Sequence, residues 1–352
     1  MTVQREFWAG KHVLITGHTG FKGGWLTLWL KEMGATLTGI ALPPSTTPNL
    51  FEAAQLHDGI SHRELDIRNA DALAQAVTQA EPQIVFHLAA QPLVRQSYKD
   101  PLNTWSTNVM GTANLLEALR ASNTVKVIII VTTDKVYHNQ EWDFPYREND
   151  ALGGHDPYSA SKAAAEILTS SYRSSFFHQR GIALATARAG NVMGGGDWSP
   201  DRLIPDAIRT WHQGGTLSIR HPEAVRPWQH VLEPISGYLV LAQKLWISPS
   251  LSDAYNFGPE TYQHINVQTI VQHAHQIYGQ GSHVVTSDPE SLHEAKILTL
   301  DTSKTRQRLG IKSAWSIEQC IQHTMSWYRE FEKGGSAHQL CCSDISAFER
   351  TK

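Results

Sequence analysis

The chain has 352 residues, of which 41% are hydrophobic and 18% are charged, and its formal net charge is −3. This composition is typical of a folded protein of one or two domains, without the basic surplus of a nucleic-acid-binding protein or the charged blocks of a disordered one. The longest apolar runs, such as residues 127–131, are too short to span a bilayer, and residues 1–10 lack the apolar core of a secretory signal peptide, so we expect a cytoplasmic location.

Cysteine and histidine show no pattern that predicts a cross-link or a metal centre. The three cysteines, at positions 320, 341 and 342, are too few for a disulfide framework. The 18 histidines include no HExxH motif, and the sequence has no paired CxxC motifs. We therefore expect no metal site.

Through the first half of the chain, short apolar runs alternate with helical patterns. We expect strands at residues 12–16, 36–41, 84–89, 127–132 and 183–187. Helices are expected between them, at residues 22–33, 70–80, 103–121 and 158–179. This alternation predicts an α/β fold, with a Rossmann-type doubly wound parallel sheet over residues 1–190.

Beyond residue 190 the alternation weakens. We expect residues 191–335 to form a smaller C-terminal α/β domain that binds the substrate, and segments near 226–258 are candidates for a return to the first sheet. Residues 336–352 are polar and are expected to form a poorly ordered tail.

A glycine-rich turn joins the first expected strand to the first helix. The segment VLITGHTGFKGGW (13–25) places Gly17, Gly20 and Gly23 there. Glycines at this point permit a tight turn and the close approach of a pyrophosphate, which binds backbone N–H groups at the helix N-terminus. The spacing is GxxGxxG and only approximates the GxGxxG dinucleotide fingerprint.

The charges after the second strand bear on the choice of dinucleotide. The acid that usually binds the ribose 2′-hydroxyl is missing, since no Asp or Glu lies between Glu32 and Glu52. No Lys or Arg lies between Lys31 and Arg63 to bind a 2′-phosphate, which favours NAD over NADP. Asp66 follows a third strand and is expected near the adenine.

The segment VTTDKVY (131–137) ends a β-branched, apolar run with Thr132, Thr133, Asp134 and Lys135. Open α/β sheets bind their ligands at the carboxyl ends of the strands, so these side chains are candidates for catalysis. The alternative is an ordinary polar turn at the end of a strand.

The segment DPYSASKAAAEIL (156–168) places Tyr158 and Lys162 on one face of a helix. A phenol with a pKa of about 10 is a poor base at neutral pH, but a neighbouring ammonium group favours the phenolate. Such a tyrosine can remove a hydroxyl proton while a hydride leaves the same carbon. The YxxxK spacing alone is common by chance, and the glycine-rich turn and Thr133 give it weight.

Together these motifs resemble the extended short-chain dehydrogenase/reductase family. The resemblance lies in TGHTGFKG (16–23), DIR (66–68), LAAQ (88–91), Asn108, Thr133 and YSASK (158–162). It implies that Thr133, Tyr158 and Lys162 are catalytic and that Lys162 also holds the nicotinamide ribose of NAD. The NAD-binding residues that it implies are Gly17, Thr19, Gly20, Phe21, Lys22, Gly23, Asp66, Ile67, Ala89, Ala90, Asn108, Tyr158, Lys162 and Arg188.

Within the family, the strand-end pattern is similar to that of the sugar-nucleotide 4,6-dehydratases, which carry an acid next to the threonine and a third functional residue after it. Oxidation at C4 acidifies the C5 proton, so that a base and an acid can expel the C6 hydroxyl as water. Asp134 is the expected acid. Lys135 stands where the deoxythymidine-linked members have Glu, and it is either the C5 base or an electrostatic residue.

The Asp134–Lys135 pair resembles the cytidine-linked branch, whose substrate is CDP-glucose and whose product is CDP-4-dehydro-6-deoxy-D-glucose. AAQPLVRQSY (89–98), ARAGNVMGGGDW (187–198), DRLIPD (201–206) and RPWQHVLEP (226–234) carry the same resemblance. It implies that Arg226 clamps the diphosphate, since guanidinium suits phosphate oxygens. The full set of expected substrate contacts is Gln91, Arg95, Ser97, Tyr98, Asn191, Trp198, Arg202, Leu203 and Arg226.

Three alternatives stay open at this point. A nucleotide-sugar 4-epimerase shares Tyr158 and Lys162 but does not need Asp134, and a GDP- or TDP-sugar could replace the CDP-sugar. A non-catalytic cofactor-binding module on the same fold would be expected to lack the Tyr or the Lys. By resemblance we also expect a homodimer, formed through the Tyr–Lys helix and helix 103–121.

Overall fold

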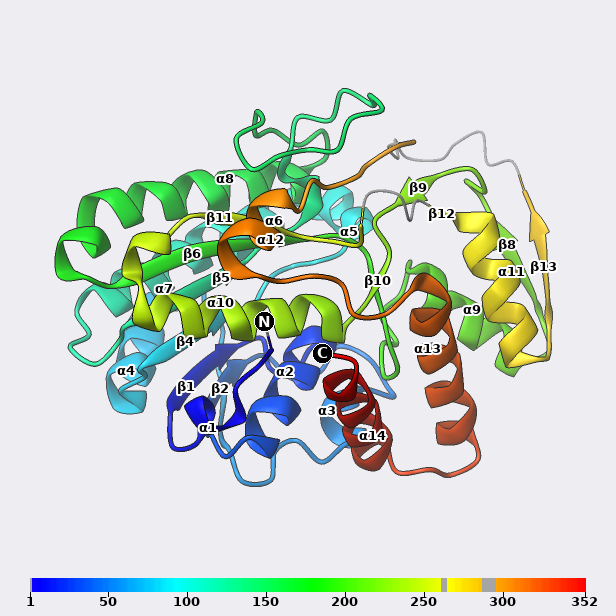
Figure 1. Ribbon diagram of the computed structural model, residues 1–352, viewed down its shortest axis with the longest axis horizontal. Coiled ribbons are helices and arrows are strands. Elements are labelled where there is room, and N and C mark those ends of the chain that lie inside the picture. Colours follow the sequence, from blue (N-terminus) through cyan, green and yellow to red (C-terminus); the bar gives the residue numbers. More distant parts are fainter. Residues whose placement is uncertain (1, 261–264, 287–295) are drawn as a thin grey trace.

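The computed structural model describes residues 2–260, 265–286 and 296–352 (Figure 1). Its centre is a seven-stranded sheet in the order β11-β6-β5-β4-β1-β2-β3, in which every neighbouring pair is parallel. Its strands are β1 (His12–Thr16), β2 (Thr36–Ala41), β3 (Ser61–Glu64), β4 (Ile84–His87), β5 (Val127–Val131), β6 (Ala183–Ala189) and β11 (Ala254–Phe257). The predicted Rossmann-type α/β fold is confirmed.

Helices cover both faces of this sheet because alternate strand residues point to opposite sides. On one face Val13 and Ile15 of β1 join the core beneath α2 and α10, and on the other Leu14 packs with residues of α4 and α7. The helices of this region are α1 (Arg5–Trp8), α2 (Phe21–Glu32), α3 (Leu50–Ala53), α4 (Ala70–Ala80), α5 (Val94–Lys99), α6 (Pro101–Trp105), α7 (Gly111–Arg120), α8 (Pro157–Tyr172) and α10 (Leu232–Ile247).

Short helical turns interrupt or extend several of these elements. The expected helix 103–121 consists of α6, the π-helical turn η1 (Ser106–Met110) and α7. The remaining turns are η2 (Asp134–Val136), η3 (Arg173–Phe177), η4 (His178–Arg180) and η5 (Pro249–Leu251). The expected strands and helices of the first half are otherwise found within a few residues of their predicted bounds.

The chain after β6 builds a region of short elements, which lies at the right in Figure 1. It contains three two-stranded sheets, β10·β7, β12·β9 and β13·β8. Its elements are β7 (Val192–Met193), α9 (Leu203–His212), β8 (Thr216–Ile219), β9 (Val225–Arg226), β10 (Gln229–His230), β12 (Ile265–Asn266), α11 (Val267–Tyr278), β13 (Ser282–Val285) and α13 (Ile317–Glu332). Between them, β11 returns to the large sheet beside β6. Helix α12 (Ser303–Leu309) instead lies against β11 and α10, over the large sheet (Figure 1).

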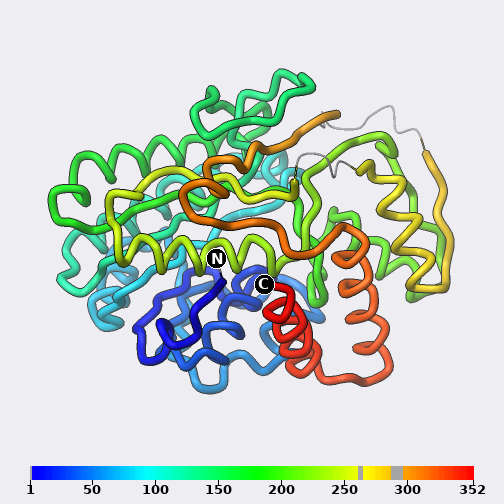
Figure 2. The backbone as a smooth tube through the Cα atoms, in the orientation of Figure 1, coloured from blue at the N-terminus to red at the C-terminus, as the bar shows by residue number. Residues whose placement is uncertain are grey.

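The expectation of a poorly ordered tail at residues 336–352 is wrong, because residues 337–350 form helix α14 (Ala337–Arg350). Cys341, Ile345 and Phe348 recur at helical spacing and are buried in the main core. The chain ends lie side by side (Figure 2), and Glu349 accepts hydrogen bonds from Arg5 Nη1 at 2.8 Å and from Trp29 Nε1 at 3.0 Å. The sequence prediction weighed the polar composition of this segment and overlooked its apolar periodicity.

Among the residues that the structure describes, none of the helices combines the length and the hydrophobicity that a bilayer crossing requires.

Candidate active site

A cavity of about 1330 Å³ opens at the carboxyl ends of β1, β4 and β5. Its walls come from the glycine-rich turn before α2, from the end of β5, from the start of α8, and from the loops between β6 and β9. Parallel strands leave such a crevice where the strand order reverses, and here β1 has β2 on one side and β4 on the other.

The glycine-rich turn is as tight as the sequence suggests. Gly17 has φ +78°, and a Cβ there would lie 2.6 Å from the backbone N of Ala89. A Cβ on Gly23 would lie 2.1 Å from Gly17 O, so β1 and α2 approach each other too closely for any side chain. Gly20 immediately precedes α2, and the nearest atom to a Cβ there is 3.4 Å away. Gly20, Phe21 and Lys22 line the cavity, so the N-terminus of α2 borders it, which fits a pyrophosphate.

An acid and an arginine lie farther along the same side of the cavity. Asp66 and Arg68 both line it, and Arg68 Nε lies 2.9 Å from Asp66 Oδ2. The Arg68 hydrogen bonds hold the pKa of the Asp66 carboxyl below its usual value. Sequence reasoning overlooked Arg68, although it is the third residue of the DIR motif.

The four residues Thr133, Asp134, Tyr158 and Lys162 converge on the cavity, and all four are buried. The first two lie where β5 passes into η2, and Thr133 Oγ1 donates a hydrogen bond to Asp134 Oδ1 at 2.9 Å. The other two lie in the first two turns of α8. Lys162 Nζ reaches back to β5 and donates to Val131 O at 3.2 Å. The structure thus brings the strand-end and Tyr–Lys motifs together in one cavity.

The α8 N-terminus is fixed by its own sequence. Pro157 occupies the first helical turn, and the Asp156 side chain accepts a hydrogen bond from Ser159 N at 2.9 Å. These are favourable start signals for a helix, so Tyr158 has a defined direction.

Burial governs the protonation of this group. It raises the pKa of Tyr158 to about 12, although the Thr133 hydroxyl and the Arg202 guanidinium lower it. It lowers the pKa of Lys162 to about 8, against the opposing effect of the Glu166 carboxylate. Burial thus moves the pKa values of the phenol and the amine in opposite directions, away from the similar values that they have in water.

Asp134 has the properties of a protonated acid. Its side chain is 1% exposed, and burial raises its pKa against the lowering effect of Lys135, Thr133 and Arg226. Its Oδ2 atom is buried and makes no hydrogen bond within the described part of the chain. A carboxyl oxygen without a partner can hold a proton that is ready to be donated.

Two lysines flank Asp134. Lys135 lines the cavity from η2, half-buried, and its backbone N–H donates to Thr133 Oγ1 at 3.4 Å. Lys22 lines it from the first turn of α2. Burial, followed by the charges of Arg202 and Lys162, lowers the pKa of Lys22 to about 7, while Asp134 raises it. Lys22 therefore faces the acid group as well as the glycine-rich turn.

Most of the other residues that the resemblance implied line the cavity. On the side of the glycine-rich turn these are Gly17, Thr19, Gly20, Phe21, Gly23, Asp66, Ile67, Ala89 and Ala90. Of the expected substrate contacts, those that line the cavity are Gln91, Arg95, Asn191, Trp198, Arg202, Leu203 and Arg226.

Four predicted residues are not among those that line the cavity. Ser97 is buried and donates to Val94 O at 2.7 Å, and Tyr98 is exposed on α5. Asn108 is buried behind the wall, where its Oδ1 accepts from Gln91 N at 2.8 Å. Arg188 is buried in an ion pair with Glu166. Asn108 contacts Gln91, which lines the cavity, and Arg188 contacts α8, whose first turns line it.

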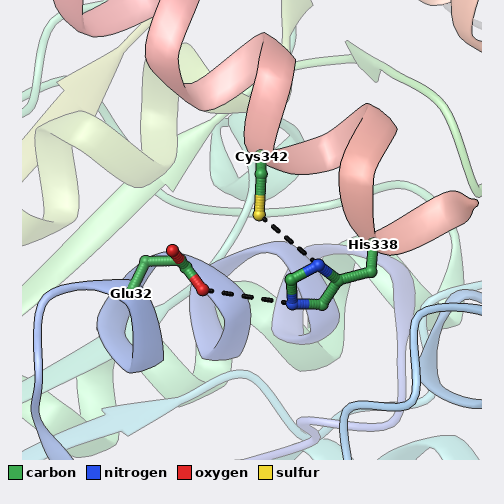
Figure 3. Close-up of side chains that lie close together, drawn as sticks. All are labelled: Glu32, His338 and Cys342. Atoms are coloured by element: carbon green, nitrogen blue, oxygen red, sulfur yellow. Dashed lines mark hydrogen bonds and ion pairs between the residues drawn. The ribbon is translucent and has the colours of Figure 1, made fainter.

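A different cluster lies outside the cavity, where Glu32 at the end of α2 meets His338 and Cys342 of α14 (Figure 3). The His338 ring stands between the other two side chains, with Nδ1 3.7 Å from Cys342 Sγ and Nε2 4.0 Å from Glu32 Oε1. One donor atom from each of the three side chains lies within 4.8 Å of the other two. The expected absence of a metal site therefore stays a prediction.

Comparison with known proteins shows the family to which this chain belongs. The sequence model of the family GDP-mannose 4,6 dehydratase matches residues 14–324. The chain belongs to this family. It is 44% identical over 347 residues to the CDP-glucose 4,6-dehydratase of Salmonella typhimurium, with 97% of this chain and 96% of that protein covered. It is 27% identical over 335 residues to the dTDP-glucose 4,6-dehydratase of Xanthomonas campestris, with 90% and 92% covered.

Solved structures share the fold of this GDP-mannose 4,6 dehydratase family member. The UDP-glucose 4-epimerase of Thermotoga maritima with UDP-glucose superposes with a TM-score of 0.79 at 21% identity, covering 91% of this chain and 99% of that one. The dTDP-glucose 4,6-dehydratase of Bacillus anthracis in complex with NAD gives 0.75 at 21% identity, covering 91% and 97%. At such identities the comparison establishes the fold alone, and epimerases and dehydratases share it.

Proposed function

We propose that this protein is an NAD-dependent CDP-D-glucose 4,6-dehydratase, which forms CDP-4-dehydro-6-deoxy-D-glucose and water. The observation that carries the proposal is the placement of Asp134, a buried carboxyl with one unpartnered oxygen directly beside Thr133. Oxidation alone requires a tyrosine and a lysine, whereas loss of water requires an additional acid. The 44% identity to a CDP-glucose 4,6-dehydratase supports the choice of the cytidine sugar.

The cavity fits NAD together with a nucleotide sugar. Pockets for one drug-sized ligand measure about 300–1,000 Å³, and this cavity is larger at about 1330 Å³. The glycine-rich turn would hold the pyrophosphate, Asp66 and Ile67 the adenosine, and Lys162 the nicotinamide ribose. Bound NAD supplies the oxidant that takes a hydride from C4 of the sugar and the reductant that returns it to C6.

Proton transfer falls to the side chains at the ends of β5 and α8. Tyr158 takes the proton of the C4 hydroxyl; burial raises the pKa of its phenol, and Thr133 and Arg202 oppose that rise. Asp134 then gives its proton to the C6 oxygen, which leaves as water. We assign removal of the C5 proton to Lys135 because it lines the cavity next to Asp134; this role requires its amine to be neutral.

The diphosphate of the substrate is assigned to the arginines on the other side of the cavity. Arg226 is buried, and its Nη1 donates to Val225 O at 2.9 Å and to Lys296 O at 3.2 Å, which fixes its direction. Arg202 is less buried and lies 3.4 Å from Asp197 Oδ2. Planar guanidinium groups suit the oxygens of a diphosphate.

Product mass is the direct test of this proposal. The protein is incubated with CDP-, TDP-, GDP- and UDP-glucose in separate reactions, each with added NAD. We expect CDP-glucose to lose the mass of one water. An epimerase would leave the mass unchanged, and loss of water from another sugar nucleotide alone would move the proposal to that substrate.

We also propose that the protein is a homodimer formed through α6, η1 and α8. Large apolar side chains lie exposed on these elements, with Leu102 80%, Ile167 60% and Met110 57% accessible. Helices α6 and α8 lie against each other, so the exposed residues belong to neighbouring surface. Apolar side chains gathered in this way are typical of a protein–protein interface.

The double substitution Leu102→Asp with Ile167→Asp is expected to convert the dimer into a monomer, because it would bury carboxylates without partners in the interface. Sedimentation velocity measures the change. Ile247→Asp is the matched control, since Ile247 is equally exposed, at 75%, but lies at the end of α10. A wild-type protein that sediments as a monomer, or a double variant that stays dimeric, would contradict this interface.

A further inference from the structure

A buried ion pair lies directly behind the Tyr158–Lys162 couple. Glu166 Oε2 and Arg188 Nη2 are 2.9 Å apart, and their side chains are 3% and 4% exposed. Neither residue lines the cavity. Tyr158, Lys162 and Glu166 succeed one another at four-residue spacing on α8, so they lie along the same face of the helix. The carboxylate is thus one helical turn beyond the lysine.

The Glu166 carboxylate has hydrogen-bond partners on both oxygens. Oε1 accepts from Thr132 Oγ1 at 2.5 Å, and Oε2 accepts from Thr186 Oγ1 at 2.7 Å as well as from Arg188. A buried charge survives in a protein only when it is paired and hydrogen-bonded in this way. Thr132 immediately precedes Thr133, so the carboxylate also holds the strand end that carries the catalytic threonine.

Arg188 connects the Glu166 carboxylate to Tyr137, the last residue of the segment 131–137. Arg188 Nη1 donates to Tyr137 Oη at 2.9 Å and to Glu148 O at 3.0 Å, and Tyr137 Oη donates to Asn256 Oδ1 at 2.6 Å on β11. Burial lowers the pKa of Arg188, but Glu166 and Tyr137 raise it more, so the guanidinium stays charged. Thr132 and Tyr137 therefore fix both ends of the segment, while Thr133 and Asp134 between them face the cavity.

The charge on Lys162 depends on its surroundings. Glu166 is the group whose charge opposes the effect of burial on the pKa of Lys162. The other titratable groups that face this amine are Lys22 from α2, His87 from β4 and Tyr158 from α8. Burial lowers the pKa of His87 to about 3, so this ring is neutral near pH 7. Glu166 is the negative charge among these neighbours.

We propose that the Glu166–Arg188 ion pair is a positioning pair for the dehydratase reaction, in which Glu166 keeps Lys162 charged and holds the strand end that carries Thr133. This inference rests on the proposed function, because that reaction needs a charged lysine beside the tyrosine. The pair acts through Lys162 and Thr133 and touches neither substrate nor cofactor. Buried ion pairs contribute little net stability, so stability alone does not explain the presence of this pair. Its carboxylate lies one helical turn from Lys162, which is the position that an effect on the lysine requires.

The test is the titration of Lys162 in the full-length protein. The rate at which acetic anhydride acetylates Lys162, followed by peptide mass spectrometry between pH 6 and 10, reports the neutral fraction of this amine and needs no substrate. In Glu166→Gln the midpoint is expected to fall by about one pH unit, because the carboxylate is removed. Glu166→Asp keeps the charge and is expected to restore most of the shift.

Glu233→Gln is the matched control. Like Glu166, Glu233 is a buried carboxylate that does not line the cavity, but it accepts from Ala314 N and Trp315 N at 2.8 Å and is not among the charges that act on Lys162. It is expected to leave the Lys162 midpoint unchanged. If Glu166→Gln does not fold, the neutral double variant Glu166→Gln with Arg188→Gln replaces it, and the midpoint is again expected to fall.

Two outcomes separate this inference from the proposed function. A Glu166→Gln or double variant with reduced thermal stability but an unchanged midpoint would overturn the positioning role and leave the pair a part of the core. Failure of the wild-type protein to release water from any nucleoside-diphosphate glucose would overturn the proposed function, and the acetylation midpoints would still decide the role of Glu166.

Discussion

The cavity has two halves that are built in different ways. The cofactor half, formed by residues 17–23, 66–68 and 88–90, depends on backbone geometry, and its critical positions are glycines that admit no Cβ. The substrate half, formed by residues 191–206 and 217–228, consists of long side chains that short strands and loops deliver. The glycines of the cofactor half lie close together in the sequence and form a recognisable motif. The side chains of the substrate half come from distant segments, so their placement depends on how those segments pack.

The residues to which we assign catalysis lie where these halves meet, at the C-terminal end of β5 and the N-terminal end of α8. Tyr158→Phe is expected to have the largest effect, because it removes the hydroxyl that takes the C4 proton and with it both half-reactions. NADH formation in a single turnover should fall by about 100- to 10,000-fold. Tyr98→Phe, an exposed tyrosine away from the cavity wall, is the control and should behave as wild type. Substantial NADH in the Tyr158 variant would contradict the assignment.

Asp134→Asn should separate oxidation from elimination. The amide cannot donate a carboxyl proton to the C6 oxygen, so formation of the 6-deoxy product is expected to fall by about 100-fold or more. Tyr158 and Lys162 remain, and the variant should still reduce NAD when substrate is added. Rapid mixing with absorbance detection followed by product analysis measures both steps. Unchanged formation of the 6-deoxy product would show that Asp134 is not the acid that protonates the C6 oxygen.

Gly23→Ala tests the backbone requirement of the cofactor half. Its methyl group would lie 2.1 Å from Gly17 O, so the turn must open to accommodate it. We expect NAD to bind about 100-fold more weakly, a loss of about 2.8 kcal/mol, in a fluorescence titration. Gly258→Ala is the control because its nearest neighbour would be 3.6 Å away. Equal NAD affinity in the two variants would show that the tight turn is not required.

Lys135→Met is expected to have the smallest effect in this series. If Lys135 removes the C5 proton, exchange of that proton with deuterated solvent should slow by at least tenfold while NADH formation continues. Nuclear magnetic resonance of the recovered sugar measures the exchange. Normal exchange would leave Lys135 with an electrostatic role beside Asp134.

The sequence revealed those parts of the protein whose requirements are local. The glycine-rich turn, the strand end at Thr133 and the Tyr158–Lys162 spacing were predicted because each lies within a few consecutive residues. Strand β3 was expected before Asp66 but without bounds, because its residues, Ser-His-Arg-Glu, lack the apolar pattern of a buried strand.

Other residues were misassigned because their environment is tertiary. Arg188 was expected at the cofactor, but the fold buries it against Glu166. Ser97 was expected at the sugar, but α5 turns its hydroxyl onto Val94 O. Glu166 itself was overlooked, although its four-residue spacing from Lys162 was visible in the sequence. Such spacing gains meaning only when the strands behind the helix are known.

The most direct test of the central claim follows the hydrogen at C4. CDP-glucose that carries deuterium at C4 is incubated with the protein and NAD, and the product is examined by mass spectrometry and nuclear magnetic resonance. A 4,6-dehydratase is expected to release one water and to deliver the deuterium to C6, because the hydride taken from C4 returns there. A hexose product of unchanged mass, with the deuterium retained at C4, would contradict the account.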